Sequence, residues 1–314
     1  MQPVRRAVID VGTNSIKLLV ADVAGHEVRP IHEESRQTRL GRGFYETHRL
    51  QPEAVACTAE AVWEFAQTAR EKNADSIRVI ATSAARDAVN PGDLTTAIER
   101  ASDLKVEIIS GKQEAEWAFQ GVTAGTELAK APLLLLDVGG GSTEFILGRG
   151  ERQHFAHSFP LGTVRLMEKF PHSDPPTRGE FIACRDWIKD FLQNEVRPRL
   201  DPALRREASS TPGGIQLVGT GGTTSILARI ENRQDRFDRD RIEATRLSLE
   251  RVQAHRRRLW GLPLAERKET PGLPKLRADV ILTGVAIYEG VMKEFGFKQL
   301  RISTRGLRFA AVMD

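Results

Sequence analysis

The sequence predicts an α/β protein built from two similar halves, and two observations carry that prediction. Along most of the 314 residues, segments with apolar residues at strand periodicity alternate with segments at helical periodicity. One arrangement of strand, glycine turn and strand also occurs twice, as DVGTNSIKLLV at 10–20 and DVGGGSTEFIL at 137–147. Both copies read Asp-Val-Gly-x-x-Ser and follow an apolar run. Such a repeat suggests two α/β halves that face each other across a cleft.

The individual elements follow from the same periodicities. In the first half we expect a β-hairpin around 10–20, a helix over 53–74, a strand over 77–82, a short helix over 92–102, a strand over 105–110 and a helix over 111–125. In the second half we expect a hairpin around 137–147, a strand-like stretch over 152–162, a long amphipathic helix over 177–200, a strand, glycine turn and helix over 215–230, an apolar helix over 278–297 and a strand over 299–304. Proline-rich 172–177 and 262–274 are predicted to be connecting loops.

Composition and charge limit the class of protein. A hydrophobic content of 40% and a charged content of 28% indicate a globular chain, and no apolar run is long enough to span a membrane. The N-terminus lacks the pattern of a signal peptide, and two cysteines form no disulfide framework, so we expect a cytoplasmic protein. The net charge of +4 suits an anionic ligand but gives no reason to expect nucleic acid. The basic run AHRRRLW (254–260) fits either a helix surface or the border of an anion-binding cleft.

Three glycine-containing turns are candidates for phosphate binding. Glycine permits positive φ and lets a phosphate approach backbone N–H groups closely, while neighbouring hydroxyls add donors. A plain hairpin explains any single turn, but three in one chain, two of them copies that begin with Asp, favour a functional reason. The candidate residues are Gly12, Thr13, Asn14, Ser15, Gly139, Gly140, Gly141, Ser142, Thr143, Gly221, Gly222 and Thr223.

Charged residues at equivalent positions of the repeat differ in sign. Strand alternation places Lys17 in the first copy where Glu144 stands in the second. The lysine suits phosphate oxygens, whereas Glu144, with Asp10 and Asp137 at the strand ends, suits Mg²⁺. The plain alternatives are a solvated lysine, an exposed strand glutamate and aspartates that bond their own turns.

Two carboxylates and one arginine complete the set of candidates. Glu114 and Glu116 fall in the first turn of the predicted helix over 111–125, where acidic residues commonly complement the helix dipole. Arg86 follows a predicted strand and is a second candidate for phosphate binding. The chain has no Gly-x-Ser-x-Gly elbow, no Walker-type phosphate loop and no pair of histidines spaced for metal binding.

These motifs together resemble one family. The two turns closely resemble those of the exopolyphosphatase/guanosine pentaphosphate phosphatase (Ppx/GppA) family. Further matches are ATSAARDA (81–88), IISGKQEAEWAFQGV (108–122), SFPLGTVRLMEKF (158–170), GTGGTTSILA (219–228), RADVILTGVAIYEGVM (277–292) and STRGLR (303–308). The resemblance spans essentially the whole chain.

The resemblance implies a fold, a reaction and residue roles. The fold would be two actin-like domains (ribonuclease H-like, ASKHA superfamily), one comprising 1–124 with about 300–314 and the other 125–299, with the active site in the cleft. The reaction would release terminal orthophosphate from inorganic polyphosphate, or the 5′ γ-phosphate from guanosine pentaphosphate, with Mg²⁺ and possible substitution by Mn²⁺. Glu114 would be the general base. Asp137 and Glu144 would act as catalytic carboxylates that position metal or water, and Lys17 and Arg86 would bind phosphate.

The sequence also departs from the family pattern. Glu116 stands where many members have arginine, and Phe309 and Ala310 replace a common Glu-Gly pair. The C-terminal helical domains of longer members, including the HD-type domain, are not in this chain, which implies either shorter substrates or a homodimer. An ATP-dependent phosphotransferase of the sugar-kinase type and a binder of polyphosphate or nucleotide without catalysis remain alternative hypotheses.

Overall fold

The computed structural model describes residues 2–210 and 214–314, which fall into two compact units. The first unit comprises Met1–Glu127, Gly139–Gly141 and Arg305–Asp314, and the second comprises Leu128–Val138 and Ser142–Thr304. Each unit contains one mixed β-sheet with helices packed against it. Among the described residues, no helix is both long and apolar enough to cross a bilayer.

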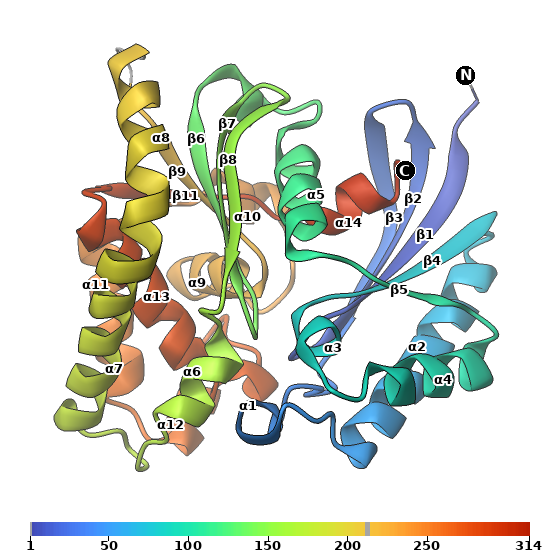
Figure 1. The fold of residues 1–314 in the computed structure, drawn as a ribbon, viewed down its shortest axis with the longest axis horizontal. Coiled ribbons are helices and arrows are strands. Elements are labelled where there is room, and N and C mark those ends of the chain that lie inside the picture. Colours follow the sequence, from blue (N-terminus) through green and yellow to red (C-terminus); the bar gives the residue numbers. More distant parts are fainter. Residues whose placement is uncertain (1, 211–213) are drawn as a thin grey trace. The chain divides into compact units, whose positions relative to one another are not determined.

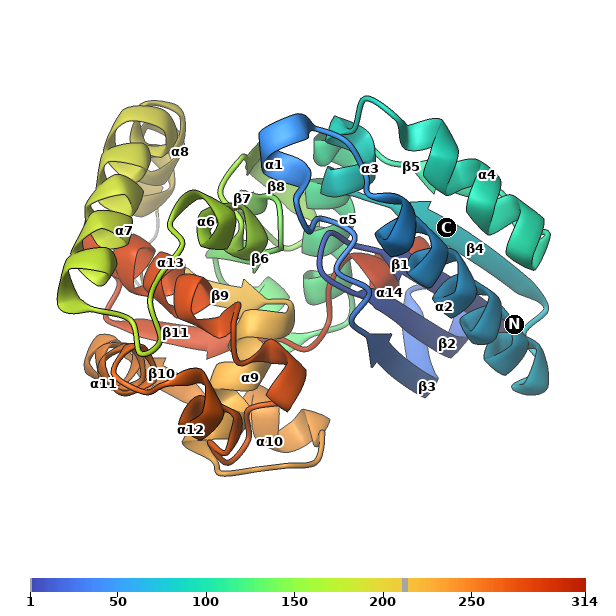
Figure 2. The same ribbon diagram turned by 90° about the horizontal axis from the view of Figure 1, so that it is seen from below.

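The first unit is built on a five-stranded sheet of order β3-β2-β1-β4-β5. Strands β1, β2 and β3 form an antiparallel meander, and β4 and β5 add in parallel. Helices α2 and α4 pack on one face, and α5 and α14 pack together on the other side (Figures 1 and 2). The bounds are β1 (Val4–Val11), β2 (Ile16–Ala24), β3 (Glu27–Arg36), α1 (Phe44–Thr47), α2 (Pro52–Glu71), β4 (Ser76–Ala81), α3 (Ser83–Asp87), α4 (Pro91–Ser102), β5 (Val106–Ile108), α5 (Gly111–Thr123) and α14 (Leu307–Ala311).

The second unit is built on a six-stranded sheet of order β10-β11-β9-β6-β7-β8. Strands β6, β9 and β11 run parallel, while β7, β8 and β10 are antiparallel to their neighbours. The bounds are η1 (Glu127–Lys130), β6 (Leu133–Val138), β7 (Thr143–Arg149), β8 (Arg152–Phe159), α6 (Thr163–Lys169), α7 (Arg178–Phe191), η2 (Leu192–Val196), α8 (Arg197–Ser210), β9 (Gln216–Thr220), α9 (Gly222–Glu231), α10 (Arg239–Ala244), β10 (Arg246–Ser248), α11 (Leu249–Trp260), α12 (Leu264–Lys268), η3 (Lys275–Arg277), α13 (Ile281–Glu294) and β11 (Gln299–Ile302).

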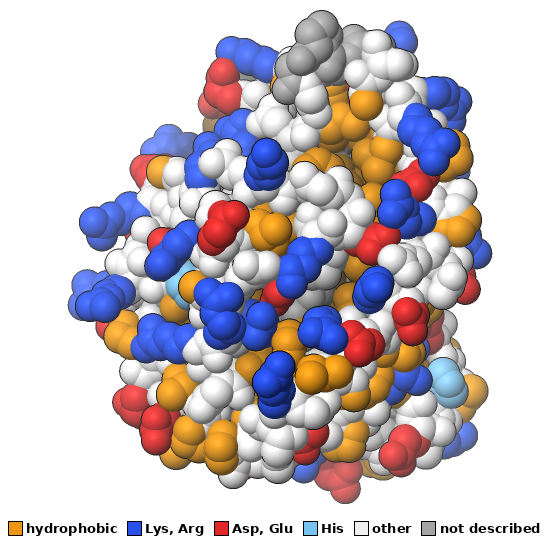
Figure 3. Space-filling view, turned by 90° about the vertical axis from the view of Figure 1, so that its left-hand side faces the viewer, with side chains coloured by type: hydrophobic (Ala, Val, Ile, Leu, Met, Phe, Trp, Pro, Cys, Tyr) orange, Lys and Arg blue, Asp and Glu red, His pale blue; other side chains and the backbone are white. Residues whose placement is uncertain are grey.

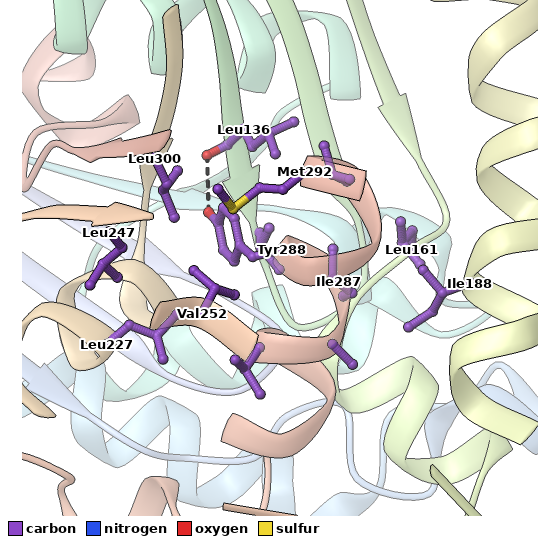
Figure 4. Close-up of a cluster of buried hydrophobic side chains, with 14 of the residues drawn as sticks. Leu136, Leu161, Ile188, Leu227, Leu247, Val252, Ile287, Tyr288, Met292 and Leu300 are labelled. Carbon is purple, nitrogen blue, oxygen red and sulfur yellow. Dashed lines mark hydrogen bonds between the residues drawn. The ribbon is translucent and has the colours of Figure 1, made fainter. Parts of the chain in front are cut away.

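One face of the second sheet forms the larger core with the helices that cover it. Leu136, Leu247 and Leu300 extend from three strands toward Tyr288 and Met292 of α13 (Figure 4). Tyr288 is completely enclosed, and its hydroxyl donates toward the carbonyl oxygens of Leu136 and Thr220, both at 3.3 Å. Burial, and then the nearby Asp137 carboxylate, raise the pKa of Tyr288 well above its usual value. The phenol is therefore neutral, and it ties α13 to the ends of two strands.

Most predicted elements are present, with two differences. The helix expected over 177–200 continues as α7, a π-helical turn and α8 to Ser210, forming one column (Figure 1). It continues because Leu192, Val196 and Leu200 keep its apolar stripe in the core. The loop expected over 262–274 contains the short helix α12, so that prediction was wrong in part. Fully buried Arg267 bonds the carbonyls of Leu262 and Ala278 and holds this segment in place.

The N-terminus of α7 makes a pH-dependent contribution to stability. Glu180 accepts from the backbone N–H groups of Thr177 and Ser173, and these hydrogen bonds lower its pKa to about 2. A carboxylate whose pKa is lowered on folding stabilises above its unfolded value and loses that contribution as pH falls. We therefore expect Glu180→Gln to lower the unfolding midpoint at pH 7, and this difference from wild type to shrink between about pH 4.5 and 2. Thermal unfolding of both proteins across that range checks it, and a pH-independent difference would contradict it.

Candidate active site

The first predicted phosphate turn is held by the segment that follows β3. Within the turn, Gly12 N–H donates to Ser15 O at 3.1 Å. From the later segment, the N–H groups of Arg39 and Gly41 donate to Asn14 O and Thr13 O, at 3.0 and 2.7 Å. The backbone of the turn is therefore held by hydrogen bonds from a segment outside it.

Asp10 and Lys17 stand directly opposite each other in the β1–β2 pair. Both lie on the face away from the Ile9 and Ile16 side of the sheet, as strand alternation requires. Asp10 is buried, and burial raises the pKa of its carboxyl, while Lys17 and Arg308 act in the opposite direction. Its Oδ1 atom has no hydrogen-bond partner among the described residues. A buried carboxylate oxygen without a partner is what a cation ligand requires.

Glu114 is a buried carboxylate, not an exposed first-turn residue. The Ser110 side chain caps α5, and Glu114 in the first turn of that helix is only 7% exposed. Arg86, in the short helix after β4, donates from Nη1 to Glu114 Oε2 at 2.9 Å and to Ile109 O at 3.2 Å. The arginine therefore fixes one oxygen of the carboxylate.

Glu116 lies on a different side of the same helix. Two residues correspond to a rotation of about 200° around an α-helix. Its side chain is 41% exposed and pairs with Lys112 Nζ at 3.7 Å. Glu116, which stands where many members of the family have arginine, therefore leaves the Arg86–Glu114 pair intact.

The glycine triplet of the second predicted turn packs with the first unit. A Cβ atom on Gly141 would lie 2.4 Å from Ser83 Oγ, 2.5 Å from Tyr45 Oη and 3.0 Å from Thr13 Oγ1. A Cβ on Gly140 would lie 2.9 Å from Thr13 Cβ. A side chain at either position would therefore force these neighbours to move, and three hydroxyl groups converge there. Ser83 and Tyr45 are not among the residues predicted from the sequence. The signal that could have identified them is a hydroxyl group beside a predicted strand end or a glycine-rich loop.

In the second unit the repeat places two acids opposite each other. Asp137 pairs with Glu144 in register, as Asp10 pairs with Lys17 in the first unit. Glu144 is 1% exposed, and its Oε1 accepts from Ser142 Oγ at 2.8 Å and Ser158 Oγ at 2.6 Å. Like charges directly opposite on neighbouring strands are destabilising, and a bound divalent cation would remove that cost. Ser158 is not among the residues predicted from the sequence.

The third predicted turn lies beside the same aspartate. Thr220, at the end of β9, pairs with Asp137 in register. Gly221 follows with φ of 89°, and a Cβ there would lie 2.7 Å from Asp137 Oδ1. Gly222 and Thr223 begin α9. Two turns that the sequence separates by about 80 residues therefore meet at one carboxylate.

The donor set fits Mg²⁺ but forms no complete protein cage. Among the described residues, no group of three or more His, Cys, Asp or Glu side chains is arranged to hold a metal. Mg²⁺ typically takes one or two protein carboxylates and completes its shell with water and phosphate oxygens. Asp137 and Glu144, and separately the orphaned oxygen of Asp10, match that requirement.

One expectation is revised by the structure. The Thr143 hydroxyl is enclosed and donates to Leu161 O, so it is not available to a phosphate. The reason is alternation, since Thr143 pairs with Val138 and Phe159 on the core side of the sheet. The basic run 254–260, for which the sequence left a helix surface and a cleft border open, forms part of α11, where Arg256 pairs with Glu289. The side of the molecule that carries α7, α8 and α11 shows basic side chains interspersed with acidic ones (Figure 3).

Comparison with known proteins points to the family that the sequence motifs resemble. The model of the Ppx/GppA phosphatase family matches residues 19–313. Exopolyphosphatase 2 of Mycobacterium tuberculosis is 36% identical over 317 aligned residues, which cover 95% of this chain and 94% of that protein.

Solved structures agree over the whole length of the chain. A protein described as exopolyphosphatase-like is 28% identical and has a TM-score of 0.87, covering 100% of this chain and 98% of that one. An exopolyphosphatase from Cytophaga hutchinsonii is 27% identical with a TM-score of 0.83, covering 98% and 96%. The similarity to these structures confirms the predicted actin-like α/β fold.

Proposed function

Because the chain belongs to the Ppx/GppA phosphatase family, we propose that it is an exopolyphosphatase that releases terminal orthophosphate from inorganic polyphosphate. The observation that carries the proposal is the buried Glu114 carboxylate, held by Arg86 at 2.9 Å at the start of α5. The 36% identity to a protein named exopolyphosphatase 2 supports the choice of polyphosphate.

The proposed reaction is direct attack by water. Glu114 accepts a proton from a water molecule whose oxygen forms a bond to the terminal phosphorus. The bridging P–O bond breaks, orthophosphate is released, and the shortened chain keeps the bridging oxygen. Such a transfer depends mainly on positioning and on neutralising the charge of the phosphoryl oxygens. The Gly12–Ser15 turn and Lys17 are the proposed phosphate contacts of the first unit.

Mg²⁺ is the proposed cofactor, with Mn²⁺ as a possible substitute. In the second unit Asp137 and Glu144 would hold it, and in the first unit Asp10 is a separate candidate carboxylate ligand. When bound, the ion would neutralise phosphate charge and polarise the phosphoryl group. Ser142 and Ser158 orient Glu144 for this role through their hydrogen bonds.

Guanosine pentaphosphate is the second candidate substrate, because the matching family is named for both activities. The test is phosphate release from long polyphosphate, short polyphosphate and guanosine pentaphosphate in parallel, each with and without Mg²⁺. We expect metal-dependent turnover with polyphosphate as the better substrate. Faster turnover of guanosine pentaphosphate would reverse the assignment, and ATP-dependent phosphorylation of an acceptor without hydrolysis would overturn it. The cytoplasmic location and the homodimer stay predictions.

A further inference from the structure

Two arginines stand directly opposite each other at the edge of the second sheet. Arg246 of β10 pairs in register with Arg301 of β11 in the antiparallel ladder. Directly opposed residues have Cβ atoms about 4.5–5.5 Å apart, and like charges at that spacing are destabilising. The neighbouring pair, Leu247 and Leu300, extends into the core (Figure 4), so the two arginines lie on the other face.

The protein satisfies only part of the hydrogen-bonding capacity of these two side chains. Arg246 donates from Nη1 alone, to Glu243 O at 2.6 Å and Thr245 O at 2.9 Å. Arg301 donates from Nη1 to the Gln216 side chain, and its enclosed Nε has no partner. Within the described residues, Nε and Nη2 of both guanidinium groups therefore lack a protein acceptor. An unpaired enclosed N–H group costs about 1–3 kcal/mol.

No direct ion pair compensates the two charges among the described residues. Glu243 is the nearby carboxylate, but its Oε1 accepts from Thr304 N at 3.0 Å and lies 3.7 Å from Arg239 Nη1. Burial, and then the charge of Arg301, lower the pKa of Arg246, while Glu243 acts in the opposite direction. The pair therefore keeps an excess of positive charge. The rest of this end of the sheet face is polar, with Ser248 opposite Gln299.

We propose that Arg246 and Arg301 form an anion-binding site that takes a phosphate group. Planar guanidinium groups bind phosphate oxygens through paired N–H donors, and one dianion would neutralise both charges. The phosphate group has two sources here, the substrate chain at some distance from its terminus, or free orthophosphate. The claim that polyphosphate occupies the site rests on the proposed function. The claim that the site binds a phosphate group does not.

The test compares Arg246→Gln and Arg301→Gln with a matched control, Arg241→Gln. Arg241 is an exposed arginine of neighbouring α10 whose side chain has no ion pair among the described residues. Calorimetric titration with orthophosphate and with tripolyphosphate is carried out in the Glu114→Gln background, which prevents turnover. We expect both test variants to bind one anion fewer per chain, or to bind that anion about tenfold more weakly. The control is expected to match its parent.

A second measurement separates anion binding from a structural role. In buffer without multivalent anions, Arg246→Gln removes a repulsion, so its unfolding midpoint should equal or exceed that of wild type. Added tripolyphosphate should then raise the midpoint of wild type more than that of the variant. A variant that is less stable without anions, or that binds both anions like the control, overturns the proposal.

Kinetics in the Glu114-intact enzyme distinguish the two sources. If the chain occupies the site, Arg246→Gln raises KM for long polyphosphate about five- to tenfold and leaves KM for tripolyphosphate unchanged. If free orthophosphate occupies it, the variant changes only inhibition by orthophosphate. If the protein hydrolyses no polyphosphate at all, the proposed function is wrong. The calorimetric comparison of the variants with the control still tests whether the anion site exists.

Discussion

Replacing Glu114 with Gln is expected to lower kcat for phosphate release from polyphosphate by about 10²–10⁴-fold, with little change in KM. The amide keeps the shape of the side chain and an oxygen for Arg86, which donates to this group at 2.9 Å, but it is not basic enough to accept the proton of water. Because the position is buried and its hydrogen bond is retained, the unfolding midpoint should stay close to that of wild type. Steady-state phosphate release and thermal unfolding, measured on the same preparation, check both statements.

Glu116→Gln is the matched control for that variant. It makes the same chemical change two residues along the same helix, where the side chain is 41% exposed and lies 3.7 Å from Lys112 Nζ. A surface pair of this kind contributes little to stability, so activity and midpoint should both remain near wild type. If Glu114→Gln retained more than about a tenth of wild-type kcat, Glu114 would not be the general base.

Replacing Gly121 with Ala is expected to have the largest effect on stability. A Cβ atom there would lie 2.1 Å from Gly306 O and 3.2 Å from Phe309 Cβ, where α5 packs on the start of α14. Backbone cannot move aside as a flexible side chain can, so the two helices must separate. Overpacking costs about 1–3 kcal/mol or more, against a gain of about 1 kcal/mol from the helix preference of alanine. We expect a net loss of about 2 kcal/mol and an unfolding midpoint lower by about 4–8 °C.

The same substitution should also reduce activity, because α5 carries Glu114 in its first turn. Gly92→Ala is the control: Gly92 lies in the first turn of α4, has ordinary backbone geometry and would bring its Cβ within 4 Å of no atom. That variant should be as stable as wild type or slightly more stable. A midpoint for Gly121→Ala within about 1 °C of wild type would show that α14 shifts freely.

The repeat is the clearest feature that the sequence alone determined. Asp-Val-Gly-x-x-Ser occurs twice in a strand–turn–strand context, and alternation predicts that Lys17 and Glu144 occupy equivalent positions. The structure confirms the equivalence, since each faces the Asp of its own first strand in register. This prediction succeeds because a strand has a side-chain period of two, which is readable from local sequence.

Local patterns were less reliable for elements held by distant contacts. Helix α12 was not predicted because its segment is rich in proline and charged residues. It is held in place by Arg267, which donates to the carbonyl oxygens of Leu262 and Ala278, one on each side of it in sequence. The Thr143 hydroxyl was assigned to phosphate because it belongs to a glycine turn, yet register places it on the core side of the sheet. In both cases a contact beyond the local window decided the outcome.

The sequence by itself determined which residue types are candidates for the proposed chemistry: the paired glycine turns, the acids at strand ends, and a glutamate that follows the cap of α5. Only the tertiary structure decided their environments. In the folded chain Glu114 is buried and accepts a hydrogen bond from Arg86, and Gly221 of the third turn lies against Asp137. Arg246 lies directly opposite Arg301. The physical reason is that motif identity is a property of neighbouring residues. Burial, charge pairing and close approach depend instead on segments that meet only when the chain folds.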